Sequence, residues 1–285
     1  MENHGKNTRK QNIFHKIILA VLICAAFVSG VWFLAEMAEN YRTQQEYERL
    51  AQSVRQQPEE ESVPETKAPV EETEKDTEPE TPRETEPPYV SPIDFEELAK
   101  INPDVVGWIR IPGTNIDYPI VQGETNDTYL HTSFEGEETA AGSIFLDFAS
   151  QKDLRGYNSI FYGHHMRNGS MFRDIVYYKE EEYFKEHQYF ELYTPKETIH
   201  LKAVSCYYIK NDPMVRRTKF KSREVFQEFV RTMLEPCDYG EIPEEPVKNL
   251  YTFVTCSYEV DDGRTVLFAV EAAPDSQEEP ETEQR

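Results

Sequence analysis

The stretch NLYTFVTCSYEVDDGR, residues 249–264, combines a strand pattern, a turn signal and a cysteine, and it decides the fold class. Its first eight residues are rich in aromatic and β-branched side chains, which predicts a strand that ends at Cys256. The tripeptide DDG is a turn signal, and RTVLFAV predicts a second strand that begins at Arg264. Residues equidistant from the centre of a hairpin face each other. We therefore predict that Cys256 and Arg264 are cross-strand neighbours.

The same strand pattern recurs through residues 91–273. Short runs of β-branched and aromatic residues are separated by Gly, Pro, Asn and Asp, as in strands joined by turns. With the hairpin included, the runs are VVGWIRI, IDYPIVQ, GSIFLDF, NSIFYGH, YFELYT, TIHLKAVSCYYI, NLYTFVTC and TVLFAVEA. About eight short strands in about 180 residues favour a barrel or a sandwich. The expected fold class is all-β.

Three helical segments accompany the predicted strands. SPIDFEELAKINPD offers Asp94 as an N-cap and a stop at Asn102 and Pro103. SMFRDIVYYKEEEYFKEH follows the fourth run, and SREVFQEFVRTMLE lies between the sixth and the seventh. In the latter, apolar residues recur at helical spacing, namely Val225, Phe226, Phe229, Val230, Met233 and Leu234. This helix should pack on the barrel.

Near the N-terminus, residues 17–35 form an uncharged run of 19 residues, close to the length that crosses a bilayer. A cleaved signal peptide is the alternative, but the run is longer than a typical signal core and no small-x-small cleavage site follows it. Basic residues precede the run and acidic residues follow it, namely Lys6, Arg9, Lys10, Lys16, Glu36 and Glu39. The positive-inside rule then predicts a cytoplasmic segment 1–16, with the rest of the chain outside the cell.

Residues 36–90 are predicted to be a polar stalk and a disordered linker rich in Pro, Glu and Thr. The formal net charge of the chain is −23, and residues 58–86 carry −9 of it. Such a segment has too few apolar residues to fold. In polyproline II form, at about 3.1 Å per residue, some thirty residues hold a domain on the order of 90 Å from the bilayer. A linker without a length requirement is the alternative.

Two further consequences follow from charge. The tail, residues 274–285, is also acidic and is predicted to be disordered. An acidic chain without a basic stripe argues against a nucleic-acid partner, because nothing would neutralise the phosphates.

The four cysteines do not form a simple disulfide framework. Cys24 lies in the apolar run, and the other three leave at least one thiol free in any pairing scheme. Cys206 lies in an apolar strand and Cys237 follows Pro236 in a loop, so a bridge between these two stays open. A free cysteine is more often a packing residue than a nucleophile. An arginine beside Cys256 would lower its pKa from about 8.5, although Arg264 could instead pair with Glu259 or Asp262 in a solvated turn.

A cysteine that performs acyl transfer needs a proton partner, usually histidine. His4 and His15 lie at or before the apolar run and are excluded. Three more histidines lack a supporting pattern and are expected to be surface or satisfied residues: His131, His187 and His200. In NSIFYGHHM, by contrast, a predicted strand ends at Gly163, and His164 and His165 follow where the chain leaves the sheet.

These segments resemble a known family. NSIFYGHHM, TFVTCSY and DDGR resemble the His, T-L-x-T-C and Arg motifs of the sortases, and the likeness extends to INPDVVGWIRIPGTNIDYPIVQ and GSIFLD. The helix between the sixth and seventh runs and the helical opening look like class B. Class C members usually carry a lid segment and a second membrane span, and we find neither pattern here. The resemblance implies an eight-stranded sortase-type β-barrel with peripheral helices, after a transmembrane helix and a disordered linker.

The resemblance also implies the site residues. Cys256 would be the nucleophile, His164 the acid and base, and Arg264 the stabiliser of the oxyanion or substrate. The histidine directly after the glycine is the family's, which selects His164 over His165. Two positions depart from the pattern: Phe253 replaces leucine, a modest packing change on a buried face, and Val254 stands where class B members often have serine.

The implied activity is that of a membrane-anchored cysteine transpeptidase. It would cleave the C-terminal sorting signal of secreted proteins at a Thr–Gly or Thr–Asn type of bond and join them to a peptidoglycan amine through a thioacyl-enzyme, without a metal or organic cofactor. One alternative is a cysteine peptidase that uses water, although such enzymes usually place the cysteine before the histidine. Another is a catalytically silent domain that binds wall or protein partners, in which Cys256 is a packing residue. The expected division of the chain is 1–16, 17–35, 36–90, 91–273 (catalytic domain) and 274–285.

Overall fold

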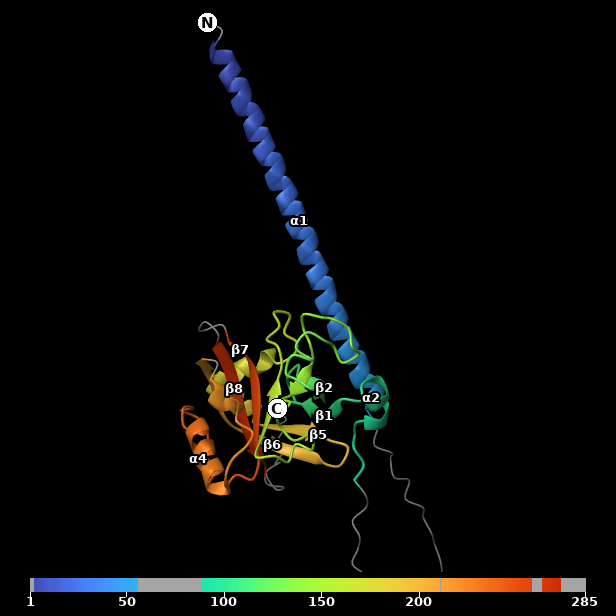
Figure 1. The fold of residues 1–285 in the computed structure, drawn as a ribbon, viewed down its shortest axis with the longest axis vertical. Coiled ribbons are helices and arrows are strands. Elements are labelled where there is room, and N and C mark those ends of the chain that lie inside the picture. Colours follow the sequence, from blue (N-terminus) through green and yellow to red (C-terminus); the bar gives the residue numbers. More distant parts are fainter. Residues whose placement is uncertain (1–2, 56–88, 211, 258–262, 273–285) are drawn as a thin grey trace, which may run out of the picture.

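The computed structural model describes residues 3–55, 89–210, 212–257 and 263–272 (Figure 1). Most of the predicted acidic linker, the turn of the predicted hairpin and the acidic tail lie outside these residues, so the disorder expected for the linker and tail stays a prediction.

Eight strands close into a barrel, which confirms the barrel and not the sandwich. They are β1 (Val105–Arg110), β2 (Asp117–Val121), β3 (Ile144–Leu146), β4 (Asn158–Tyr162), β5 (Tyr189–Tyr193), β6 (Thr198–Lys210), β7 (Leu250–Ser257) and β8 (Gly263–Glu271). Their order around the barrel is β1-β2-β3-β4-β7-β8-β6-β5. All eight predicted runs therefore contain a strand.

The barrel is mixed, because β2 pairs with β3 and β4 pairs with β7 in parallel. Parallel neighbours need a crossover connection, so long segments separate these strands in the sequence. The β2–β3 connection spans residues 122–143, and the chain between β4 and β7 contains two strands and several helices. These long connections carry much of the candidate site.

The parallel pair β4–β7 is joined through aromatic packing inside the barrel. Phe161 and Phe253 are register partners, and their rings stack with centroids 4.9 Å apart and planes inclined by 13°. Phe253 is fully buried, as predicted for this strand face. Burial of such a side chain contributes about 1.5–3 kcal/mol. The phenylalanine that departs from the family pattern is thus part of the core.

The predicted helices are present with small changes. In α2 (Phe95–Ile101), the Asp94 carboxylate accepts a hydrogen bond from the Glu97 N–H at 2.9 Å, as expected of an N-cap. The second helical segment divides at Glu180 into the 3₁₀-helix η1 (Arg173–Lys179) and α3 (Glu181–Glu186).

The third helix, α4 (Arg223–Leu234), packs on the outside of the barrel as predicted. Phe226, Phe229 and the other apolar residues of its face are buried against β4, β6, β7 and β8. Val225 is the exception, since it lies in the first turn and is 38% exposed. The predicted apolar face therefore begins one residue later.

The N-terminal apolar run lies within α1 (Asn3–Val54), one helix of 52 residues. Among the described residues, α1 is the helix that is long and apolar enough to cross a membrane, by length and composition alone. The large apolar side chains of residues 17–34 are exposed in this structure. In Figure 1, α1 projects far beyond the barrel.

The last turns of α1 pack on the barrel, although their sequence is polar overall. Tyr47, Leu50, Ala51 and Val54 are buried and belong to the same core cluster as β1 and β2. They follow one another at spacings of three, one and three, so they form a narrow apolar stripe on one face of the helix. A stripe this narrow does not raise the average hydropathy of the segment, which explains why composition indicates a stalk.

The ends of the acidic linker are adjacent in space. The Asp94 N–H donates to the Val54 carbonyl at 2.7 Å, so the chain returns to the end of α1 (Figure 1). The linker therefore does not separate α1 from the barrel, and the expected spacing on the order of 90 Å is wrong.

A chain that starts at residue 91 is expected to be less stable than one that starts at residue 41. It loses the burial of Tyr47, Leu50 and Val54, each worth about 1.5–3 kcal/mol. The melting temperature of fragment 91–273 should fall by about 10 °C or more relative to 41–273. In the matched control, residues 56–88 of fragment 41–273 are replaced by a short Gly/Ser linker, and Tm should stay unchanged. Equal Tm values for fragments 91–273 and 41–273 would contradict the packing role of α1.

Candidate active site

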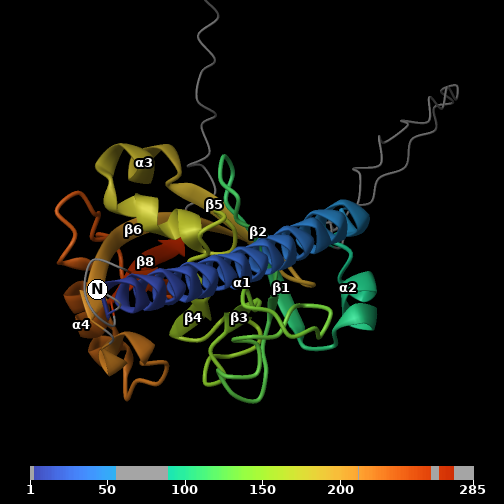
Figure 2. The same cartoon turned by 90° about the horizontal axis from the view of Figure 1, so that it is seen from above.

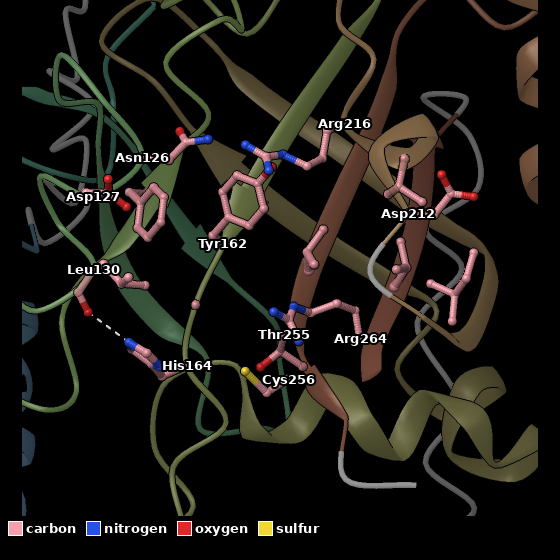
Figure 3. A pocket seen from close by; sticks show the side chains of 16 residues that line it. Asn126, Asp127, Leu130, Tyr162, His164, Asp212, Arg216, Thr255, Cys256 and Arg264 are labelled. Atoms are coloured by element: carbon pink, nitrogen blue, oxygen red, sulfur yellow. Dashed lines mark hydrogen bonds between the residues drawn. The ribbon is translucent and has the colours of Figure 1, made fainter. Parts of the chain in front are cut away.

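A cavity of about 320 Å³ opens on the barrel between β4, β7, β8 and the loops that follow β2 and β6 (Figure 3). All three predicted site residues line it: His164, Cys256 and Arg264. The structure thus brings together residues that lie about ninety positions apart in the sequence. We call this cavity the Cys256 pocket.

Cys256 and Arg264 face each other across the β7–β8 pair. They are register partners, which confirms the predicted hairpin. Cys256 is a half-buried free thiol, and both side chains point into the Cys256 pocket (Figure 3). The Arg264 guanidinium also donates to the Gly263 carbonyl at 2.8 Å. The alternative partners Glu259 and Asp262 lie outside the described residues.

This pair suits attack on a carbonyl group. A cysteine sulfur adds to a carbonyl carbon as a nucleophile once a base has taken its proton. A guanidinium can also donate hydrogen bonds to the oxyanion that forms when sulfur adds to a carbonyl carbon. Both functions require the side chains to share one cavity, which the register of β7 and β8 ensures.

His164 enters the same pocket because it directly follows the paired end of β4. The Gly163 N–H donates to the Val254 carbonyl at 3.2 Å, which continues the β4–β7 pairing by one residue. A Cβ atom at Gly163 would lie only 2.5 Å from Ile144 Cδ1 and 2.6 Å from the Phe172 ring. Glycine is therefore needed here for close packing, and the next residue emerges at the rim of the pocket.

The His164 ring is held by a backbone carbonyl. Its Nε2 lies 2.8 Å from the Leu130 carbonyl oxygen (Figure 3). Since a carbonyl only accepts hydrogen bonds, Nε2 carries the proton, and in the neutral ring Nδ1 is the basic nitrogen. Burial lowers the pKa of His164, the bond to Leu130 raises it, and nearby His131 lowers it further, for a net decrease. The ring is thus mainly neutral at pH 7.

His165 points elsewhere. Its Nδ1 lies 3.1 Å from the Cys256 carbonyl oxygen, so it contacts the β7 backbone, and it does not line the Cys256 pocket. Burial also lowers the pKa of His165. Of the two adjacent histidines, His164 is the one placed to exchange protons with groups in the pocket.

The remaining histidines partly fit their expected roles. His187 is buried, its Nδ1 lies 3.0 Å from the Tyr183 carbonyl oxygen, and its ring stacks on Tyr183, so it is satisfied as predicted. His200 lies on β6 with Nδ1 3.6 Å from a Glu191 oxygen.

His131 is exposed, as expected, but its ring stacks on His164 with centroids 5.5 Å apart. The sequence carries no signal for that contact, because it depends on the path of the β2–β3 connection.

The far end of the pocket contains polar residues that sequence reasoning missed. The Tyr162 hydroxyl and the Asn126 amide each donate to Oδ2 of buried Asp147, both at 2.9 Å. Burial, followed by the neighbouring Asp147 charge, raises the pKa of Tyr162, so its hydroxyl stays protonated. Arg216, from the 3₁₀-helix η2 (Pro213–Arg216), lies beside Tyr162 (Figure 3).

Val254 forms part of the wall between these two ends. It lines the pocket and is 7% exposed, so the position where class B members often carry serine does face the cavity. An isopropyl group offers no hydrogen bond. A ligand therefore meets an apolar surface at this point of the wall.

The other cysteines outside α1 are not part of the pocket. Cys206 and Cys237 are free thiols, and both are buried. Burial strongly raises the pKa of Cys206, which keeps it protonated. Buried thiols of this kind are inert packing residues.

Comparison with protein-family models matches residues 109–272 to the Sortase domain. The chain belongs to the sortase family. Sortase B of Staphylococcus aureus is 36% identical to this sortase over 136 residues, which are 48% of this chain and 56% of that protein. Sortase B of Listeria monocytogenes is 31% identical over 177 residues, which are 61% of this chain and 72% of that protein.

Solved structures agree with this assignment to class B. The sortase B structure from Clostridium perfringens aligns with a TM-score of 0.59 and 32% identity, covering 63% of this chain and 100% of that one. A Staphylococcus aureus sortase B–substrate complex has a TM-score of 0.57 and 30% identity, and the alignment covers 63% of this chain and 86% of that one. A sortase B complexed with triglycine has a TM-score of 0.57 and 31% identity, and the alignment covers 63% of this chain and 86% of that one.

Proposed function

We propose that this sortase cleaves a C-terminal sorting signal of secreted proteins and transfers them to an amine of the peptidoglycan. The observation that carries the proposal is the shared pocket of Cys256, Arg264 and His164, in which a nucleophile, a fixed cation and a mainly neutral imidazole meet. Sortase B has been solved with a substrate and with triglycine, which supports a peptide donor and an amine acceptor.

The first half-reaction forms a thioester. The Cys256 thiol gives its proton to the imidazole of His164, and the sulfur adds to the carbonyl carbon of the scissile peptide bond. Arg264 donates to the resulting oxyanion. The C–N bond then breaks, and the leaving amine takes the proton from His164. The acyl group remains on Cys256, and the C-terminal fragment departs.

The second half-reaction reverses these roles. The acceptor amine attacks the thioester carbonyl and gives its extra proton to His164, while Arg264 again stabilises the oxyanion. The C–S bond breaks, and Cys256 recovers its proton from His164. A new amide joins the secreted protein to the acceptor, and the enzyme returns to its starting state.

The low basicity of His164 suits this cycle. Burial favours the neutral ring, so a base is ready to accept the thiol proton. The same burial makes the imidazolium form a stronger acid, which favours rapid protonation of the leaving amine. One histidine can therefore serve both half-reactions.

The location follows from α1 in this proposal. Residues 17–35 cross the membrane with segment 1–16 in the cytoplasm, and residues 91–273 form the catalytic domain outside. The end of α1 is added to that domain, since Thr43 is the first residue along α1 whose side chain the structure describes as buried. Eight helical residues from Ala35 to Thr43 span about 12 Å. The barrel then works close to the outer membrane surface, facing the cell wall.

Incubation of the full chain with a panel of sorting-signal peptides and triglycine tests the proposal. Mass spectrometry should detect a peptide–triglycine amide for at least one peptide and a thioacyl adduct on Cys256. Hydrolysis product alone, with triglycine present, would indicate a cysteine peptidase that uses water. An absence of any adduct across the panel, on protein shown to be folded, would count against catalysis.

A further inference from the structure

The docked end of α1 contacts one of the loops that surround His164 and reaches the other through Tyr118. One is the β2–β3 connection, which supplies the Leu130 carbonyl. The other follows β4 and begins with His164 itself. Figure 1 and Figure 2 show that only the last turns of α1 lie against the barrel, beside α2 and the β1–β2 side, while the rest of the helix projects away from it. A single residue of α1, Tyr47, reaches toward both loops.

The first contact path runs through Gly142. The Tyr47 hydroxyl donates to the Gly142 carbonyl at 3.0 Å and lies 3.3 Å from Ser143 Oγ. Gly142 has φ +57°, and its backbone packs so closely on the Leu130 carbonyl that any side chain there would overlap it. The Leu130 carbonyl in turn accepts from His164. Tyr47 therefore supports the segment that holds the histidine ring.

The second path runs through Tyr118. Its ring meets the Tyr47 ring edge to face, with centroids 5.2 Å apart. The Tyr118 hydroxyl accepts a hydrogen bond from the Met171 N–H at 3.1 Å. Met171 has φ +59°, a conformation that a residue with a side chain adopts only under constraint, and it pairs with His165. The Phe172 N–H then binds the His164 carbonyl at 2.9 Å.

Tyr47 itself is well fixed. It is 3% exposed, and its hydroxyl and its ring are both engaged. A second α1 residue, Thr43, shares a hydrogen bond with Thr139 of the same connection at 3.2 Å. The contacts of α1 with the β2–β3 connection are thus polar and directional, which goes beyond apolar packing.

We propose that Tyr47 is a positioning residue, through which the docked end of α1 holds the Leu130 carbonyl and the His164 loop in their active arrangement. The inference rests on the proposed function of His164 as acid and base. It makes α1 part of the catalytic apparatus as well as an anchor. Without the Tyr47 hydroxyl, the β2–β3 connection loses a directional contact, and the hydrogen bond from His164 to Leu130 weakens.

The test uses the full chain in detergent micelles and the isosteric change Tyr47→Phe, which keeps the ring in the core. We expect kcat of transpeptidation to fall about tenfold, with KM changed less than about twofold, because the acid and base are displaced and the substrate wall is not. NMR titration of the labelled histidines should show a lower midpoint for His164, since its bond to Leu130 raises the pKa.

Tyr41→Phe is the matched control, because Tyr41 lies on the same helix but is 64% exposed. It should change neither kcat nor the His164 midpoint. An unchanged kcat and midpoint in Tyr47→Phe would overturn the proposal, even with a lowered Tm, since Tyr47 would then serve stability alone. Should His164→Ala retain activity, the proposed function would fail, while the midpoint shift in Tyr47→Phe would still establish the positioning contact.

Discussion

Replacing Cys256 with alanine is expected to abolish both cleavage and transfer of a sorting-signal peptide. Among the described residues, no other thiol lines the Cys256 pocket, so the variant has no sulfur there to form a thioester. The rate should fall by at least about 10⁴-fold, as for removal of a catalytic nucleophile. Intact-protein mass spectrometry in the presence of substrate should show the acyl adduct on the wild-type chain and none on the variant.

Cys24→Ser is the control for this experiment, because Cys24 is exposed on α1, away from the pocket. Its rate should match that of the wild type. A Cys256→Ala variant that retains more than about 1% of the transfer rate would refute the thioacyl mechanism. Near-normal thermal unfolding of the variant would show that the loss concerns chemistry, since Cys256 is half-buried and contributes little to the core.

Replacing His164 with alanine is expected to lower kcat by about 10²–10⁴-fold, the usual contribution of a general acid and base. His165→Gln should cost less than about tenfold, because His165 contacts the Cys256 carbonyl and does not line the pocket. Steady-state kinetics with one peptide and one amine distinguish the two variants. A larger loss for His165→Gln would reverse the assignment.

The contribution of His164 to the stability of the fold changes with pH in a direction that its burial determines. Burial lowers its pKa, so the ring stays neutral at pH 7 and gains a proton only below about pH 6.5. The folded state therefore binds this proton less tightly than the unfolded state, and the contribution of His164 to stability decreases as the pH falls through that range. NMR titration should place its midpoint below about 6.5.

Local patterns predicted several features that the structure confirms. The runs of β-branched and aromatic residues contain the strands, and Asp94 caps a helix, because strand and cap preferences depend on near neighbours in the sequence. The pairing of Cys256 with Arg264 also depends on neighbouring residues, because residues equidistant from the centre of a hairpin face each other. Two of the three predicted site residues, Cys256 and Arg264, could therefore be placed together from one short stretch.

Other features depend on contacts between distant segments. The proximity of His164 to Cys256 requires β4 and β7 to pair in parallel, which periodicity does not predict, and only family resemblance selected His164 over His165. The structure adds a physical basis for that choice, because His164 lines the pocket, whereas His165 contacts the Cys256 carbonyl. The sequence does not predict the polar cluster at the far end of the pocket, because its hydrogen bonds join different loops and strands. The cluster consists of Asn126, Asp147 and Tyr162.

The strands, the caps, the apolar helix and the Cys256–Arg264 pair could be predicted from the sequence, because each depends on residues close together in the chain. The closure of the barrel, the surroundings of His164 and the docking of the end of α1 depend on contacts between distant segments, so they emerge only in the folded chain. Averaged over its length, the end of α1 is polar. Its narrow apolar stripe stabilises the fold only because a complementary surface on the barrel buries Tyr47, Leu50 and Val54. Burial is a property of two surfaces together, and the sequence of one segment describes only one of them.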